Sequence, residues 1–297
     1  MWDELQFALA LIVSGLSIGL MYSLIALGFV LVYKATDAIN FAQGEFVMLA
    51  GFVAAVSLGE KIPVLAAVAI AIAVMVVFSF ALERIVLRPL LGRPIVAVIM
   101  ATIGLGAMLR GLPPITVGGE TRAVSLPIGD TPITFGPISL PPVQVLGVVV
   151  TLMFLAVFTR FFLKSRMGVA MRAVADNQQV AMAMGINVER YFALAWAMAG
   201  TVSALGGVIW GSMLGVDVHL ALVGLKVFPV VILGGLDSIV GAVIGGLIVG
   251  VVESLAAGYL DPYVGGGTKD FAPYVLMILM LMFKPYGMFG THRIERV

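Results

Sequence analysis

The sequence contains no cysteine and has few charged residues. Without cysteine, the chain can form no disulfide, thiol nucleophile or thiolate metal site. Charged residues make up 11% of the 297 positions and hydrophobic residues 61%, whereas soluble domains carry about a quarter charged residues. This composition indicates a polytopic membrane protein. The net charge of +1 gives no reason to expect a nucleic-acid partner.

Sequence motifs for catalysis are also missing. The chain has neither the GxxxxGK[ST] motif that binds phosphate nor the HExxH motif that binds zinc. The segment Gly265–Lys269 is rich in glycine, but a serine or threonine does not follow its lysine. We therefore predict no catalytic residue, no metal ligand and no cofactor bound by this chain. An enzyme is not expected.

Long apolar runs dominate the sequence. A helix needs about 20 mostly apolar residues to cross a bilayer. The runs predict an all-α membrane protein with about eight transmembrane helices, a broken or re-entrant segment and a cytoplasmic helix, in one transmembrane domain, residues 1–297. The predicted spans are Leu5–Val32, Phe41–Leu58, Ile62–Leu87, Ile95–Leu112, Val143–Leu163, Tyr191–Leu214 and Phe271–Phe289. A broken region, Leu225–Leu233 followed by Ile239–Ala257, precedes the last span.

Lysine and arginine are distributed unevenly between alternate loops. Loops on one side hold twelve of the 17 basic residues, and an excess of basic residues marks cytoplasmic loops. We therefore predict that this side is cytoplasmic, that the N-terminus lies outside and that the C-terminus lies inside. The twelve are Lys34, Arg84, Arg88, Arg93, Arg160, Lys164, Arg166, Arg172, Arg190, Lys284, Arg293 and Arg296.

Residues 225–257 contain an interruption. The run Leu225–Leu233 is too short to cross a bilayer at 1.5 Å per residue, and a polar break containing Gly234, Gly235 and Asp237 follows it. The region must enter the membrane and return, either as two short spans or as a re-entrant pair. Because irregular backbone at membrane depth is buried in protein or lines a cavity, these three residues are candidates for the translocation pathway.

Glycines recur in the helix after this break. Gly241 and Gly245 form one GxxxG pair, and Gly246 and Gly250 form another. Such spacing lets two helix backbones approach closely in a membrane. The preferred interpretation is helix packing or dimerisation.

A polar stretch also begins the second predicted span. Asp37 or Asn40 can cap the helix there, and Glu45 lies near the positive end of its dipole. An ionisable residue inside a membrane helix is a candidate functional residue, so Asn40, Gln43 and Glu45 are candidates for the pathway. The alternative is that these residues only start the helix, with Glu45 bonded to a neighbouring helix.

Residues 164–190 form a polar interruption on the predicted cytoplasmic side. Its middle consists of good helix formers, and Gly185 stands where a left-handed residue ends a helix. An Ala/Met face could dock in a groove of another protein, or the helix could merely connect two spans. Docking is preferred because many connectors are shorter. The residues assigned to docking are Arg172, Ala173, Asp176, Ala181 and Gly185.

Residues 113–142 form the longest predicted external loop. Proline, glycine and threonine alternate with valine, leucine and isoleucine in it, which predicts short strands and turns. We expect this loop to be a landing surface for an external partner.

Four stretches of the chain resemble the permease subunits of branched-chain amino acid (leucine/isoleucine/valine) ABC importers, of the H type. They are residues 15–51, 83–94, 168–190 and 234–253. The resemblance implies a subunit of the bacterial inner membrane, surrounded by membrane lipid, that pairs with a related M-type permease. It also implies two cytoplasmic ATPase subunits that use ATP, a periplasmic substrate-binding protein, and a coupling helix over 168–185 that rests in an ATPase groove.

The chain departs from the family pattern at two places, and its cargo stays open. Gln43 stands where the family usually has histidine, and Asn177-Gln178 replaces a more common Asp-Arg pair. Family members also carry urea, short amides and aromatic acids, so the sequence does not decide which solute is carried. It also does not decide whether the permease forms a homodimer or a heterodimer. A rival from another class is a proton-coupled secondary transporter with Glu45 as the proton carrier.

Overall fold

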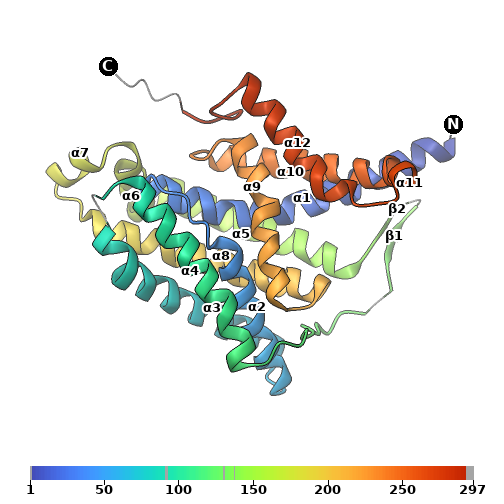
Figure 1. Cartoon of the computed structure of the whole chain (residues 1–297), viewed down its shortest axis with the longest axis horizontal. Helices are drawn as coiled ribbons and strands as arrows, with labels where there is room; N and C mark the ends of the chain where they lie inside the picture. Colours follow the sequence, from blue (N-terminus) through green and yellow to red (C-terminus); the bar gives the residue numbers. More distant parts are fainter. Residues whose placement is uncertain (1, 91–92, 130, 137, 292–297) are drawn as a thin grey trace. The chain divides into compact units, whose positions relative to one another are not determined.

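The computed structural model describes residues 2–90, 93–129, 131–136 and 138–291 (Figure 1). Arg293 and Arg296, counted above among the cytoplasmic basic residues, lie outside them. The elements are α1 (Trp2–Thr36), α2 (Gln43–Gly59), α3 (Val64–Leu82), the π-helix η1 (Glu83–Leu87), the 3-10 helix η2 (Arg88–Leu90), α4 (Ile95–Thr116), β1 (Ile133–Phe135), β2 (Ile138–Leu140), α5 (Pro142–Lys164), α6 (Arg166–Asp176), α7 (Gln178–Ala183), α8 (Val188–Leu214), the 3-10 helix η3 (Val218–Ala221), α9 (Leu222–Gly234), α10 (Ile239–Tyr259), α11 (Asp261–Val264) and α12 (Thr268–Phe283).

The predicted all-α membrane fold is confirmed. Within the described residues, six helices are long and apolar enough to cross a bilayer: α1, α3 with its extension to Leu90, α4, α5, α8 and α10. Two shorter apolar helices accompany them, α2 and the continuous stretch Val218–Gly234. The predicted last span, Phe271–Phe289, is wrong at its C-terminal boundary. Helix α12 ends at Phe283, because a residue that precedes proline, here Lys284, disfavours helical backbone.

The described chain forms two compact units that are interleaved in the sequence. The first unit contains residues 1–30, 128–151 and 225–297, and the second contains residues 31–127 and 152–224. Three of the four boundaries fall inside the helices α1, α5 and α9. The units are therefore not consecutive domains joined by a linker.

The first unit is held together by glycines on α10. A Cβ atom at Gly250 would overlap the carbonyl oxygen of Gly15, and one at Gly246 would overlap that of Gly19, so α10 and α1 touch backbone to backbone. Gly241 and Gly245 make the corresponding approach to α9, at Gly234 and Val230. The packing role predicted for both GxxxG pairs is thus confirmed within a single chain. In lipid the hydrophobic effect does not bring helices together, so close packing of their backbones at small residues provides the association instead.

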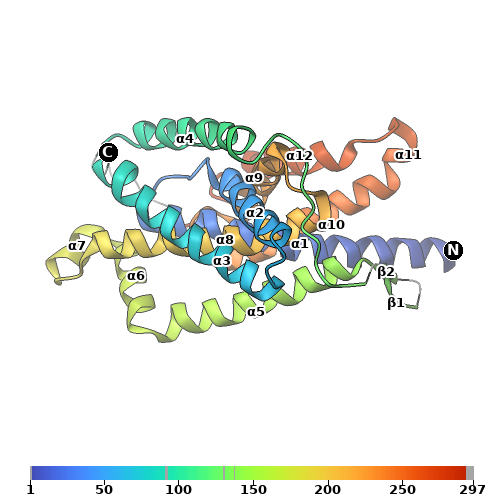
Figure 2. The ribbon, with the colours of Figure 1, turned by 90° about the horizontal axis from the view of Figure 1, so that it is seen from below.

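The second unit is built around α8, which packs against both α2 and α3 (Figures 1 and 2). Gly207 of α8 lies against the backbone of α2, and Gly200 lies against the backbone of α3 at Met75. Trp196, one turn before Gly200 in α8, is buried. Its ring centroid is 6.1 Å from that of Phe46, which lies 5.5 Å from Phe78. Three helices from distant parts of the sequence therefore share one aromatic core.

The strands and turns predicted for residues 113–142 are confirmed in the second half of this loop. Strands β1 and β2 pair antiparallel, with Ile133 opposite Leu140 and Thr134 opposite Ser139. The start of the loop instead continues α4 up to Thr116, with Pro113 and Pro114 inside the helix.

A comparison of Gly250→Ala with Gly104→Ala tests the packing of α10 on α1. A methyl group at Gly250 would overlap backbone atoms of α1, whereas nothing lies within 4 Å of the same methyl group at Gly104 in α4. Overpacking of this kind costs about 1–3 kcal/mol. We expect Gly250→Ala to lower the unfolding temperature in detergent by several degrees, and Gly104→Ala to leave it unchanged or raise it. Equal unfolding temperatures for the two variants would contradict the packing.

Candidate functional site

The first candidate site is the polar break between α1 and α2, in the second unit. The backbone leaves the helical region at Asp37, where φ is +56°. The Asn40 carboxamide then organises the turn: its oxygen accepts from the Ala42 N–H at 3.1 Å, and its nitrogen donates to the Gln43 side-chain oxygen at 3.1 Å. Both side chains are completely buried. The N-cap residue of α2 is Ala42, which has no side-chain capping bond, so the predicted cap by Asp37 or Asn40 is wrong. Asn40 instead orders the turn that precedes the helix.

Two neighbouring helices complete the hydrogen bonds of this break. Gln43 donates to the Ser203 hydroxyl of α8 at 2.9 Å, and the Phe41 N–H donates to the Thr102 hydroxyl of α4 at 3.3 Å. Ser203 lies fifteen residues after the start of α8, which is about 22 Å along the helix. The break therefore lies beside the interior of α8 and not at its end.

Glu45, the third residue of α2, forms an ion pair with Arg110 of α4. The Arg110 Nε and Nη2 atoms each lie 2.7 Å from the same carboxylate oxygen. Gly106, one turn before Arg110, leaves room for the carboxylate, because a Cβ there would lie 3.2 Å from its carbon. Of the two interpretations of Glu45, the structure thus shows the bond to a neighbouring helix.

Arg110 is the residue of this site that the sequence analysis missed. It lies inside α4, six residues before the helix ends at Thr116. The signal that could have found it is a single arginine inside an apolar span, because charged residues in spans are rare and serve a function or a pair. Glu45 is 3% exposed, whereas the Arg110 side chain is 52% exposed. The pair therefore has one buried and one accessible member.

The second candidate site is the break between α9 and α10, in the first unit. The C-terminal turn packs onto it: the Met288 N–H donates to the Leu233 carbonyl at 2.9 Å and the Phe289 N–H to the Gly234 carbonyl at 3.0 Å. Gly235 adopts a φ of +104°, and a Cβ there would lie 2.5 Å from the Gly290 nitrogen. Its missing side chain makes room for this turn.

The other candidate residue of this break also contacts the chain's C-terminal end. The Asp237 carboxylate accepts from the Thr291 N–H at 3.2 Å. Helix α9 itself has 13 residues, about 20 Å at the rise of an α-helix. That is shorter than the roughly 30 Å hydrocarbon core of a bilayer, as expected for a broken helix.

The third candidate site is the polar segment 164–190, which forms two helices. The single docking helix predicted here is wrong, because Asn177 interrupts it with extended backbone, at φ −154° and ψ 107°. The Asn177 side-chain oxygen then accepts from the Val180 N–H at 2.9 Å and so caps α7. Ser165 caps α6 in the same way, accepting from the Gly168 N–H at 2.9 Å. Asparagine and serine are favoured at this position because they satisfy free N–H groups at a helix start.

The predicted end of this segment is confirmed. Gly185 has a φ of +80°, a left-handed conformation that glycine adopts without strain. Its N–H donates to the Met182 carbonyl at 2.9 Å, and the Ile186 N–H donates to the Ala181 carbonyl at 3.0 Å. These are the two bonds of a Schellman motif.

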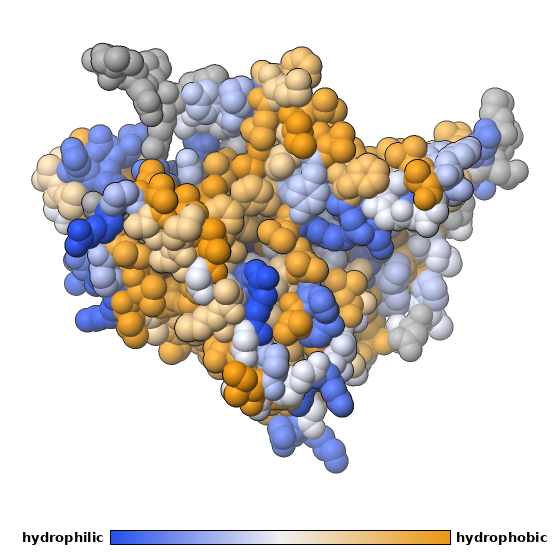
Figure 3. All heavy atoms as spheres, in the orientation of Figure 1, coloured by the Kyte–Doolittle hydropathy of each residue, from blue (hydrophilic) through white to orange (hydrophobic). Residues whose placement is uncertain are grey.

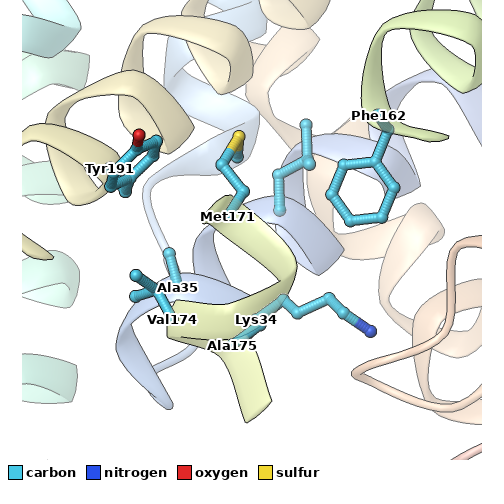
Figure 4. Close-up of a pocket in the computed structure, with 8 residues that line it drawn as sticks. Lys34, Ala35, Phe162, Met171, Val174, Ala175 and Tyr191 are labelled. Carbon is cyan, nitrogen blue, oxygen red and sulfur yellow. The ribbon is translucent and has the colours of Figure 1, made fainter. Parts of the chain in front are cut away.

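The inner face of α6 sits on the ends of three membrane helices. Met171 and Val174 are buried, and Figure 4 shows them beside Ala35 of α1, Phe162 of α5 and Tyr191 of α8. The hollow left among these side chains has a free volume of about 10 Å³, roughly enough for one water molecule. Helix α6 is therefore closely packed on the ends of α1, α5 and α8.

Arg172 faces inward as well. Its guanidinium donates to the Phe162 carbonyl and lies 5.5 Å from the Phe162 ring centroid. Phe162 is in the last turn of α5, where free carbonyls and the helix dipole favour a cation. Arg172 thus binds the C-terminal end of α5 instead of projecting toward a partner.

The outer side of the segment carries exposed apolar residues among polar ones. Met184 is 77% exposed, and Val180 and Met182 are also exposed. Of the other residues assigned to docking, Ala181 is buried, Ala173 is half-buried, and Asp176 and Gly185 are exposed. The exposed apolar residues at α7 are therefore methionines and a valine, and not the residues that the sequence assigned to docking. In Figure 3, hydrophilic residues gather where α6 and α7 lie, whereas the surface over α4 is largely hydrophobic.

Comparisons with known proteins agree with this architecture. Residues 11–283 match the family described as "Branched-chain amino acid transport system / permease component". The high-affinity branched-chain amino acid transport system permease protein BraD of Pseudomonas aeruginosa is 32% identical, over 99% of both chains. The corresponding permease protein LivH of Escherichia coli is 30% identical over the full length of both chains.

A solved structure shares the fold at low identity. The chain in the complex titled "PsaBC from Streptococcus pneumoniae in complex with Fab" superposes with a TM-score of 0.51 at 11% identity, over 94% of this chain and 92% of that one. Because the family match covers most of the chain, the protein belongs to the permease components of branched-chain amino acid transport systems.

Proposed function

We propose that this chain is the membrane permease of an ATP-driven importer that moves branched-chain or related amino acids from a periplasmic binding protein into the cytoplasm. The observation that carries the proposal is the segment α6–α7. It is packed on the ends of three membrane helices on its inner side and presents exposed methionine and valine on its outer side. Family membership supports amino acids as the class of cargo. The external binding protein would decide whether the solute is instead a related one, such as urea, an amide or an aromatic acid.

Energy comes from other subunits in this proposal. The chain has no phosphate-binding motif, so ATP is bound and hydrolysed by two cytoplasmic ATPase subunits. The permease pairs with a related M-type permease in the bacterial inner membrane. The excess of basic residues on one side supports a cytoplasmic C-terminus and an external N-terminus.

The packing of α6 explains how motion of the ATPase reaches the membrane helices. An ATPase that binds Met182 and Met184 moves α7. Helix α6 moves together with α7, because the short turn at Asn177 joins the two helices. Since Met171, Val174 and Arg172 attach α6 to α1, α5 and α8, the ends of these helices move together. Packed interfaces switch between discrete arrangements, which gives the inward-open and outward-open states that import requires.

We place the pathway beside the Glu45–Arg110 pair, together with Asn40 and Gln43. A half-exposed guanidinium inside a span is costly against hydrocarbon, so the surface of α4 around Arg110 faces water. The contacts of Gly234, Gly235 and Asp237 with the C-terminal turn favour a structural role for the second break. A proton carrier at position 45 would have to release Arg110 in every cycle, which disfavours the secondary-transporter alternative.

The coupling role predicts a specific loss when Met182 and Met184 are both changed to Glu. In the docked complex, the two new carboxylates would be buried without partners in the apolar groove of the ATPase, which is energetically costly. We expect substrate-stimulated ATP hydrolysis of the reconstituted importer to fall at least tenfold, with normal insertion of the permease. The control is Gln179→Glu, which adds charge to α7 without removing an apolar side chain. Undiminished hydrolysis in the double variant would contradict the docking surface.

The pathway predicts that a thiol near Arg110 is accessible from water. Because the chain has no cysteine, Ala107→Cys introduces a single thiol one turn from Arg110, on an exposed position of α4. We expect a membrane-impermeant maleimide to label it in membranes. Val157→Cys on α5, exposed but at an apolar position, serves as the lipid-facing control and should not react. Equal labelling of the two, or none at residue 107, would place Arg110 outside the pathway.

A further inference from the structure

A groove of about 430 Å³ opens in the second unit where α3 ends and α8 begins. This volume is within the range of sites that bind small molecules. Met167 of α6 lines one side, so the groove adjoins the coupling segment. The lining residues from α3 and its extension are Phe80, Arg84 and Arg88, and those from the start of α8 are Asn187, Glu189, Arg190, Ala193, Leu194 and Ala197.

One end of the groove carries uncompensated positive charge. Arg88 is already neutralised, because it contacts Glu83 at 3.0 Å and Glu189 at 2.9 Å. Arg84 and Arg190 are exposed, and among the described residues neither has an acidic partner. Two arginine side chains therefore present free guanidinium donors, which suit the oxygens of a phosphate group.

The other end of the groove is apolar and extends into the spans. Phe80 lies four residues before Arg84 in the apolar helix α3, and Ala197 lies seven residues after Arg190 in α8. Seven residues correspond to about 10 Å along a helix. The groove therefore runs from a charged rim into the depth of two candidate membrane helices.

We infer that this groove binds an anionic phospholipid, with its phosphate on Arg84 and Arg190 and an acyl chain along Phe80, Leu194 and Ala197. Basic pockets between membrane helices suit anionic headgroups, and the apolar half suits hydrocarbon. A water-soluble partner would not reach into a span, and a free phosphate ion would leave the apolar half unfilled. The lipid would contact α3, α8 and Met167 together, and would so link the coupling segment to the membrane.

Native mass spectrometry of the purified permease, with the subunits that accompany it, tests this site. The protein is prepared from membranes that contain phosphatidylglycerol and phosphatidylethanolamine. We expect wild type to retain phosphatidylglycerol preferentially and the variant Arg84→Gln/Arg190→Gln to lose at least five-sixths of it. The matched control is Arg160→Gln/Lys164→Gln, which removes two exposed charges from α5 outside the groove and should lower retention less than twofold.

A second variant separates a lipid from an ion. Ala197→Phe fills the apolar end and leaves both arginines in place, so it should also lower phosphatidylglycerol retention severalfold. Unchanged retention in this variant would show that only the phosphate binds and would overturn the lipid site. The lipid site would also be overturned if Arg84→Gln/Arg190→Gln and Arg160→Gln/Lys164→Gln lost equal amounts of phosphatidylglycerol. The same holds if wild type showed no preference for phosphatidylglycerol over phosphatidylethanolamine. Size-exclusion profiles and unfolding temperatures show that each variant is folded.

Discussion

Contact between helix backbones at glycine is the interaction on which both units depend. In a chain that is 61% hydrophobic, apolar side chains face lipid as readily as protein, so they do not by themselves bring helices together. Glycine allows closer approach: α10 meets α1 at Gly246 and Gly250, and α8 meets α2 and α3 at Gly207 and Gly200. These approaches decide which helices are neighbours, and so which polar groups meet.

The polar break before α2 depends on this packing. Backbone groups at membrane depth need partners within the protein, and the second unit supplies them from two helices. Ser203 of α8 binds Gln43, and Thr102 of α4 binds the Phe41 N–H. The contact of Gly207 with α2, one turn beyond Ser203, holds α2 and α8 in the register that makes these bonds possible.

The polar segment 164–190 is divided between two helices with different contacts. Helix α6 is bound to the membrane helices through Met171, Val174 and Arg172, and α7 carries the exposed surface. Gly168 permits the sharp turn from α5 into α6, because a Cβ there would overlap the last carbonyls of α5. In the proposed importer, a force on α7 would act on these helix ends in the second unit, beside the groove proposed to bind a phospholipid.

The sequence by itself determined the features that local composition controls. Apolar runs predicted the spanning helices, Gly185 predicted the left-handed end of α7, and motifs along the whole chain indicated the permease family. The tertiary structure alone decided which groups meet. Glu45 could not be assigned to Arg110, because 65 residues separate them and no local pattern links α2 to α4. Arg172 was expected to face a partner, but the end of α5 provides carbonyl acceptors for it. The physical reason is that hydropathy and helix capping act over a few residues, whereas the partner of a charge depends on how distant helices pack.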